Sequence, residues 1–100
     1  MASVMKMRWE GVTEEQYDQL RGLVRWENDH PDGGMFHVAY FTGGGINVID
    51  VWESPAKFDT FMNERLGPGI QQVGVAGEPQ ISWYDAHAVY NPAAERAGVA

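Results

Sequence analysis

The chain has 100 residues, no cysteine and a formal net charge of −7, from 7 basic and 14 acidic side chains. This acidic balance repels phosphate backbones and anionic headgroups, so we expect neither nucleic acid nor a membrane surface as a partner. Without cysteine, disulfides and thiolate sites are excluded. The length and the lack of a long apolar run predict one cytoplasmic domain at residues 1–92, followed by a flexible tail at residues 93–100.

The first half of the chain predicts a strand, a helix and a loop. Residues 3–9 alternate between polar and apolar side chains, which is the period of a strand. Thr13 and Gln16 have the spacing of a capping box, and apolar residues then recur at helical spacing to about Glu27. Residues 28–34, NDHPDGG, are rich in turn formers, so we interpret them as a loop with His30 as a turn residue.

The second half predicts a hairpin, a helix and a last strand. Strands at residues 35–41 and 46–53 are joined by TGGG, which is typical of a hairpin turn. Ser54 and Pro55 start a helix, which GPG at residues 67–69 is predicted to break. Residues 79–90 form the last strand. The order β-α-β-β-α-β indicates a ferredoxin-like α+β fold, with a four-stranded antiparallel sheet and both helices on one face.

Such a sheet has one face covered by helices and one open face, and the hairpin assigns residues to them. With Gly43 and Gly44 at the centre of the turn, His37 lies opposite Asp50. That face carries the pairs His37–Asp50, Met35–Trp52 and Ala39–Val48, and the other carries Phe36, Val38, Ile49 and Val51. Because the second set is uniformly apolar, we assign it to the covered core and the set containing His37 to the open face.

The last strand is assigned by the same alternation, whereas the first strand stays unassigned. Trp83, Asp85 and His87 share one face, and the alanines of the other face are small enough to fit beneath helices. We therefore predict these three residues, and Phe41 of the second strand, on the open face. An exposed face of this kind marks an interface, so we expect a homodimer whose two open faces enclose a pocket for a hydrophobic small molecule.

Three segments of the chain resemble a known family. They are GMFHVAYF, then GINVIDVWESPAKFDTFMNERLGPGI, then a final strand with His87 near its end. Over residues 3–90 the sequence is similar to the dimeric α+β barrel superfamily, and within it to short actinobacterial proteins of the antibiotic-biosynthesis-monooxygenase-like group. The resemblance implies a dimer in which each sheet completes a barrel, with His37 and His87 of different chains in one cavity. Relatives include cofactor-independent monooxygenases of polycyclic phenols, polyketide cyclases, lactone isomerases and haem-binding proteins, so the fold leaves the reaction open.

The candidate chemistry centres on an imidazole beside a carboxylate. His37 is suited to move a proton at neutral pH, and Asp50 would fix its tautomer, with His87 assisting. The opposing interpretation is that His37 and Asp50 form only a polar link in a dimer interface. The remaining candidates would bind substrate as cavity walls or polar contacts; they are Trp52, Trp83, Asp85, Phe41, Met35 and Val48.

The leading hypothesis is a small-molecule enzyme without a redox cofactor. It would be an oxygenase, cyclase or isomerase that uses His37 as general base on a hydrophobic aromatic or polyketide-like metabolite. We expect no cofactor and no metal, although a non-haem iron site of two His and one Asp, or haem bound by His37 or His87, stays open. Two competing hypotheses are a non-catalytic ligand-binding module and a structural dimer whose interior is filled.

Overall fold

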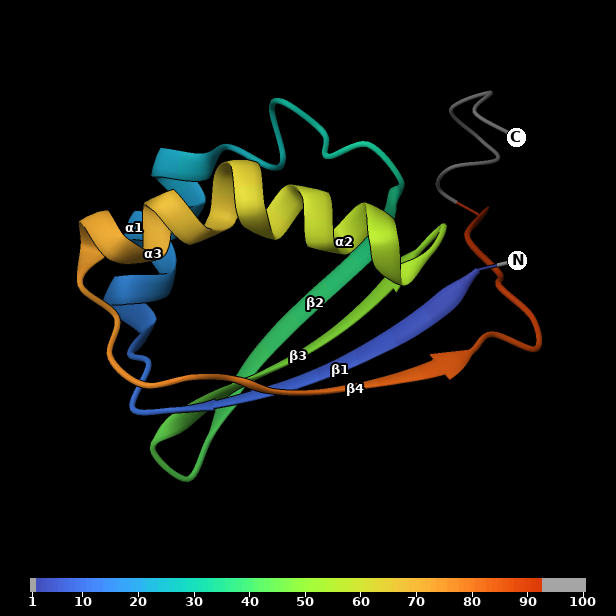
Figure 1. The fold of residues 1–100 in the computed structure, drawn as a ribbon. Coiled ribbons are helices and arrows are strands. Elements are labelled where there is room, and N and C mark those ends of the chain that lie inside the picture. The colour runs from blue at the N-terminus through green and yellow to red at the C-terminus, as the bar shows by residue number, and fades with distance from the viewer. Residues whose placement is uncertain (1, 93–100) are drawn as a thin grey trace.

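The computed structural model of the protein describes residues 2–92, which form a four-stranded antiparallel sheet with helices on one face (Figure 1). The elements are β1 (Ser3–Glu10), α1 (Glu14–Val24), β2 (Gly34–Thr42), β3 (Gly45–Trp52), α2 (Pro55–Phe61), the π-helical segment η1 (Met62–Leu66), α3 (Gly67–Val73) and β4 (Gln80–Asp85). The strand order β2-β3-β1-β4 confirms the predicted ferredoxin-like α+β class. Within residues 2–92 no helix is long and apolar enough to cross a bilayer. The expected tail at residues 93–100 lies outside the described residues.

Helix α1 begins as the sequence predicts and ends earlier. The Thr13 hydroxyl accepts from the backbone N–H of Gln16 and the Gln16 side chain accepts from the N–H of Thr13, which completes the capping box. The helix was expected to run to about Glu27 but ends at Val24. Arg25 adopts a left-handed backbone conformation with φ 60°, and its N–H donates to the carbonyl of Arg21, so the helical ladder closes there.

The predicted break at residues 67–69 is wrong, because α2, η1 and α3 follow one another as a continuous helical run. Pro68 has no N–H, and its ring would clash with the carbonyl four residues before it in a regular α-helix. The chain widens into a π turn instead, in which the N–H of Gly67 donates to the carbonyl of Met62. A Cβ at position 67 would lie 2.8 Å from that carbonyl oxygen, so the turn requires the glycine.

The hairpin between β2 and β3 has the predicted register over most of its length. Gly43 and Gly44 have φ values of 54° and 79°, which is the left-handed conformation that a tight hairpin turn needs. His37 pairs with Asp50 as expected. A bulge at Met35 shifts the end of the ladder, so Trp52 pairs with Gly34 and the predicted Met35–Trp52 pair is wrong.

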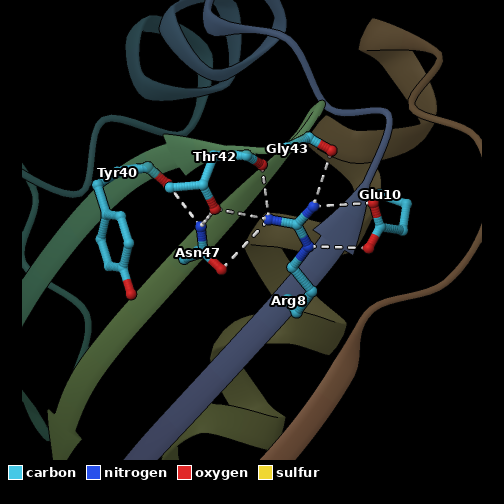
Figure 2. Close-up of polar contacts among 6 residues, drawn as sticks. All are labelled: Arg8, Glu10, Tyr40, Thr42, Gly43 and Asn47. Atoms are coloured by element: carbon cyan, nitrogen blue, oxygen red, sulfur yellow. Dashed lines mark hydrogen bonds and ion pairs between the residues drawn. The ribbon is translucent and has the colours of Figure 1, made fainter.

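A side chain of β1 braces the hairpin turn (Figure 2). The Arg8 guanidinium donates to the carbonyls of Thr42 and Gly43 and to the side-chain oxygen of Asn47, at 2.9, 3.3 and 3.3 Å. Glu10 accepts from two nitrogens of the same guanidinium, both at 2.9 Å, and this hydrogen bond lowers the pKa of Glu10. The open sheet face at this end is therefore held by polar contacts instead of helix packing.

The structure reverses the predicted assignment of the two sheet faces. The helices cover the face that carries Met5, Met7 and Trp9 of β1 together with Ile46, Val48, Asp50 and Trp52 of β3, all of which are buried. The open face carries Phe36, Val38, Tyr40 and Tyr84, all of which are exposed, with half-buried Ile49 and Val51. Strand β1 decides the matter, because it alternates these apolar residues with Lys6 and Arg8, which could not be buried beneath helices.

The last strand follows the same reversal and is shorter than expected. Strand β4 ends at Asp85, not at residue 90. Trp83, predicted on the open face, lies on the helix side, where its ring packs edge-on against Phe58 with 5.7 Å between centroids. Asp85 lies exposed at the strand end, and His87 is exposed in the segment that follows.

Candidate active site

A cavity of about 300 Å³ lies between the covered face of the sheet and the helices. It thus lies within a single chain, and not between two open faces as the sequence analysis expected. Its walls are mainly apolar and aromatic side chains of β1, β3, α1 and the α2–α3 run, among them Met5, Met7, Leu20, Phe58, Phe61 and Ile70. His37, Asp50 and Tyr17 contribute polar groups to the lining, so the cavity combines an apolar body with a localised polar cluster.

The predicted His37–Asp50 pair is formed in this lining. The Nδ1 atom of His37 lies 2.6 Å from Oδ1 of Asp50, and the two residues are cross-strand partners on β2 and β3. The Asp50 side chain is 7% exposed, whereas the His37 side chain is 33% exposed. The carboxylate is therefore buried beneath the imidazole, which is the more accessible member of the pair.

Tyr17 of α1 completes the environment of His37, and the sequence analysis did not identify it. Its hydroxyl lies 2.8 Å from Nε2 of His37, and the two rings are stacked at 7° with centroids 6.1 Å apart. Because an ionised Asp50 can only accept, we assign the proton to Nδ1, and Nε2 then accepts from Tyr17. Burial raises the pKa of Tyr17 above its ordinary value near 10, so the hydroxyl is a donor at neutral pH.

Trp52 holds the other oxygen of the carboxylate. Its indole N–H donates to Oδ2 of Asp50 at 3.0 Å, and both side chains are buried. Residues two apart on a strand share a face, so the sequence Asp50-Val51-Trp52 places the indole and the carboxylate together. The result is a hydrogen-bonded row that runs from Trp52 through Asp50 and His37 to Tyr17.

The loop between α1 and β2 forms another wall of the cavity, whereas the sequence analysis interpreted residues 28–34 as a loop with His30 as a turn residue. Trp26, His30 and Pro31 of this loop line the cavity. The Trp26 ring meets the His37 ring at 63° and the Tyr17 ring at 57°, with centroids 5.6 Å apart in each case. The aromatic cluster therefore packs around the imidazole from the helix side.

Two basic side chains of the helical run fasten this loop. One guanidinium nitrogen of Arg65 donates to the carbonyls of Val24 and Asp29, at 2.9 and 2.8 Å. The Lys57 ammonium donates to Asp32 at 2.6 Å, and this hydrogen bond raises the pKa of Lys57. The loop that covers His37 is thus tied to η1 and to α2.

Comparison with protein-family models gives no match, and comparison with curated protein sequences gives none either. Solved structures do match. The NE2512 protein of Nitrosomonas europaea, a protein of unknown function, has a TM-score of 0.68 at 14% identity, covering 91% of this chain and 94% of its own. A proposed antibiotic-biosynthesis monooxygenase of Caulobacter crescentus gives 0.64 at 13% identity, with coverages of 87% and 91%. SnoaB of Streptomyces nogalater, a cofactor-independent oxygenase, gives 0.62 at 9% identity, with coverages of 88% and 94%.

The chain shares its fold with these solved structures. This agrees with the predicted likeness to the dimeric α+β barrel superfamily. Identities this low establish the fold and leave the chemistry to be argued from the residues of the site.

Within this fold, the site residues predicted from the sequence separate into two groups. Met35, Val48 and Trp52 line the cavity together with His37 and Asp50. Phe41 and Trp83 lie behind the lining on the helix side, where Phe41 packs edge-on against Tyr17 with 6.2 Å between centroids. Asp85 and His87 are exposed and do not line the cavity. Within residues 2–92 no three His, Asp or Glu side chains lie together as metal ligands.

The residues that sequence analysis missed lack a local signal. Tyr17 lies on the apolar stripe of α1, where a tyrosine is expected to be a packing residue. Trp26 lies in a segment that was expected to be the end of the helix. Only the helical period of Tyr17 with Leu20 and Val24 could have placed its ring on the sheet-facing side.

Proposed function

We propose that this protein is a small-molecule enzyme in which His37, oriented by Asp50, acts as general base on a hydrophobic substrate held in the cavity. The observation that carries the proposal is the 2.6 Å contact of Nδ1 with a buried carboxylate, on an imidazole that lines an apolar cavity. A carboxylate that accepts from one ring nitrogen fixes the tautomer and leaves the lone pair on the other nitrogen. Nε2 is therefore the atom that takes the proton, and in this structure it accepts a hydrogen bond from the Tyr17 hydroxyl.

The cavity supports a largely apolar, aromatic substrate. Its volume of about 300 Å³ exceeds the roughly 150 Å³ that is enough to hold benzene, which disfavours a filled, purely structural interior. The described lining contains aromatic and thioether side chains but no lysine or arginine. A carboxylate or phosphate would find no lysine or arginine there, so we expect a substrate that binds uncharged and carries a weakly acidic O–H or C–H group.

The proposed first step is proton transfer from this acidic group to Nε2. The substrate group takes the place of the Tyr17 hydroxyl, which then donates to a substrate oxygen, and Asp50 stabilises the imidazolium that forms. The resulting anion can cyclise, isomerise or react with dioxygen. In the oxygenation, a methylene carbon gains one oxygen atom as a carbonyl, and the second oxygen leaves as water with the two methylene hydrogens. The similarity to SnoaB, a cofactor-independent oxygenase, supports dioxygen as the co-substrate.

We also propose that the open sheet face forms a homodimer. Phe36, Val38, Tyr40 and Tyr84 are exposed by 51, 39, 49 and 56%, which is an unusual concentration of aromatic and aliphatic surface on one face. Pairing two such faces would bury this surface while leaving a complete His37 cavity in each protomer. The dimer would then stabilise the fold without contributing residues to the chemistry.

Oxygen uptake with dithranol, a tricyclic phenolic anthrone, tests the function. We expect uptake with the unchanged protein, and a loss of at least about 100-fold in His37→Gln, because a general base contributes roughly 10² to 10⁴ in rate. Asp50→Asn should reduce the rate by a smaller factor. Far-UV circular dichroism confirms that the variants are folded.

The outcomes separate the hypotheses. Uptake that is unchanged in folded His37→Gln would refute the role of this residue. Saturable binding of dithranol, followed by quenching of tryptophan fluorescence, with no product in any variant would favour the non-catalytic ligand-binding module.

A further inference from the structure

The side chain of Trp52 is tightly packed, so the direction of its indole N–H is fixed. The residue is 3% exposed, and its ring packs against Phe58 and Phe61 with centroids 5.4 and 5.6 Å away. Strand β3 fixes its backbone through pairing with Gly34 and Ser3 on the two neighbouring strands. The donor that meets Asp50 is therefore rigid.

The two oxygens of the Asp50 carboxylate have different partners. Oδ1 accepts from His37 at 2.6 Å, and Oδ2 accepts from Trp52 at 3.0 Å. Because a carboxylate is planar, a fixed donor on Oδ2 also fixes the direction in which Oδ1 points. The indole thereby aims the carboxylate at Nδ1 and satisfies the oxygen that would otherwise be buried without a partner.

We propose that Trp52 is the positioning residue of the His37 base, acting through Asp50, rather than only an aromatic wall of the cavity. The role in catalysis rests on the proposed function, whereas the hydrogen-bonded arrangement can be tested without a substrate. The inference also gives a physical reason for the Asp50-Val51-Trp52 sequence, whose two outer residues form one acceptor–donor unit.

The proposal predicts how the pair binds a proton. With a neutral imidazole the pair carries one negative charge, and the indole N–H stabilises this form more than the protonated form, which is neutral overall. Removing the N–H should therefore make the pair keep its proton to higher pH. The other titratable groups that act on the pair are Tyr17 from α1 and Glu27 from the loop, and His30 of the same loop lines the cavity; the substitution leaves all three in place.

The experiment is an NMR titration of the imidazole resonances in the unchanged protein, Trp52→Phe and Trp83→Phe. His37→Ala assigns the His37 signal, and the exposed His87, which lies outside the cavity lining, serves as the internal reference. In Trp52→Phe we expect the His37 midpoint to rise by roughly 0.5 to 1 pH unit, a three- to tenfold change in proton affinity. Trp83→Phe is the matched control, because its ring also packs on Phe58 but comes from β4, which β1 separates from β3. It should leave the midpoint unchanged.

An unchanged midpoint in Trp52→Phe, or an equal shift in Trp83→Phe, would overturn the proposal. If Trp52→Phe does not fold, benzothienylalanine at position 52 keeps the bicyclic shape and replaces the N–H by sulfur, and the same shift is expected. Because the titration needs no turnover, its result stands even if dithranol is not consumed. If dithranol is consumed, the acid limb of the rate profile should move to higher pH by the same amount in Trp52→Phe, and stay in place in Trp83→Phe.

Discussion

Replacing His37 by leucine tests whether the carboxylate beneath it is ionised and dependent on its partners. In His37→Leu the buried Asp50 keeps the indole of Trp52 but loses the imidazole at 2.6 Å. Leaving a buried hydrogen-bonding group without its partner costs about 1–3 kcal/mol, and more when the group is a carboxylate. The imidazole is 33% exposed and borders the cavity, so water can replace part of the contact. We therefore expect a loss of about 2–3 kcal/mol, or roughly 10–20 °C in Tm for a domain of this size.

The triple variant His37→Leu, Asp50→Leu, Trp52→Phe provides the decisive comparison. It removes every polar member of the buried row except the Tyr17 hydroxyl, so no donor or acceptor is left unmatched at its centre. Replacing a buried polar network by apolar side chains of similar size is close to neutral, and the adjoining cavity accepts the added volume. We expect it to recover to within about 1 kcal/mol of the unchanged protein.

Urea unfolding followed by far-UV circular dichroism measures these differences, because the fluorescence of Trp52 is lost in the triple variant. The reasoning is refuted if His37→Leu is as stable as the unchanged protein, or if the triple variant is no more stable than His37→Leu. The expected pattern would mean that the row is not needed for stability, which leaves chemistry as its role.

Three further predictions concern other parts of the molecule. Gly22→Ala, where a Cβ meets nothing within 4 Å, should stabilise the protein by about 0.5–1 kcal/mol in urea unfolding. In Gly69→Ala the added Cβ would lie 2.8 Å from the Val24 side chain, so this variant should be less stable than Gly22→Ala by about 1–3 kcal/mol. Because the pKa of Tyr17 is raised on folding, its contribution to stability is complete below about pH 10 and is lost as the pH rises further. Above about pH 10 the unchanged protein should therefore lose more stability in urea unfolding than Tyr17→Phe, and an equal loss would contradict this. On the open face, Val38→Glu should convert the proposed dimer into a monomer in light scattering, and an unchanged mass would place any interface elsewhere.

Local signals in the sequence were sufficient for the order of elements and for one contact of the candidate site. The capping box at Thr13 and the paired glycines of the hairpin act over a few residues, and the structure contains both. The hairpin register in turn predicted His37 opposite Asp50, because cross-strand pairing follows from the turn geometry. These features depend on neighbouring residues along the chain, which is why they could be predicted.

The direction in which this pair faces could not be obtained from the hairpin, because alternation is symmetric and both of its faces are rich in apolar residues. Strand β1 distinguishes the two faces, because Lys6 and Arg8 cannot lie in the core. Met5 lies on the opposite face, where it pairs with Asp50, so that face is the buried one. The uniform apolar surface of Phe36 and Val38 pointed the opposite way, since an exposed apolar face resembles a core in sequence.

The sequence by itself determined the fold class and the His37–Asp50 pairing, since both follow from short-range periodicity and turn chemistry. Only the tertiary structure decided that the pair borders a cavity beneath the helices, that Tyr17 and Trp52 complete its hydrogen bonds, and that the helical run passes through Pro68. The physical reason is that these outcomes depend on how whole layers pack. A buried polar group is tolerated when distant residues supply its partners, and the sequence around it does not reveal them.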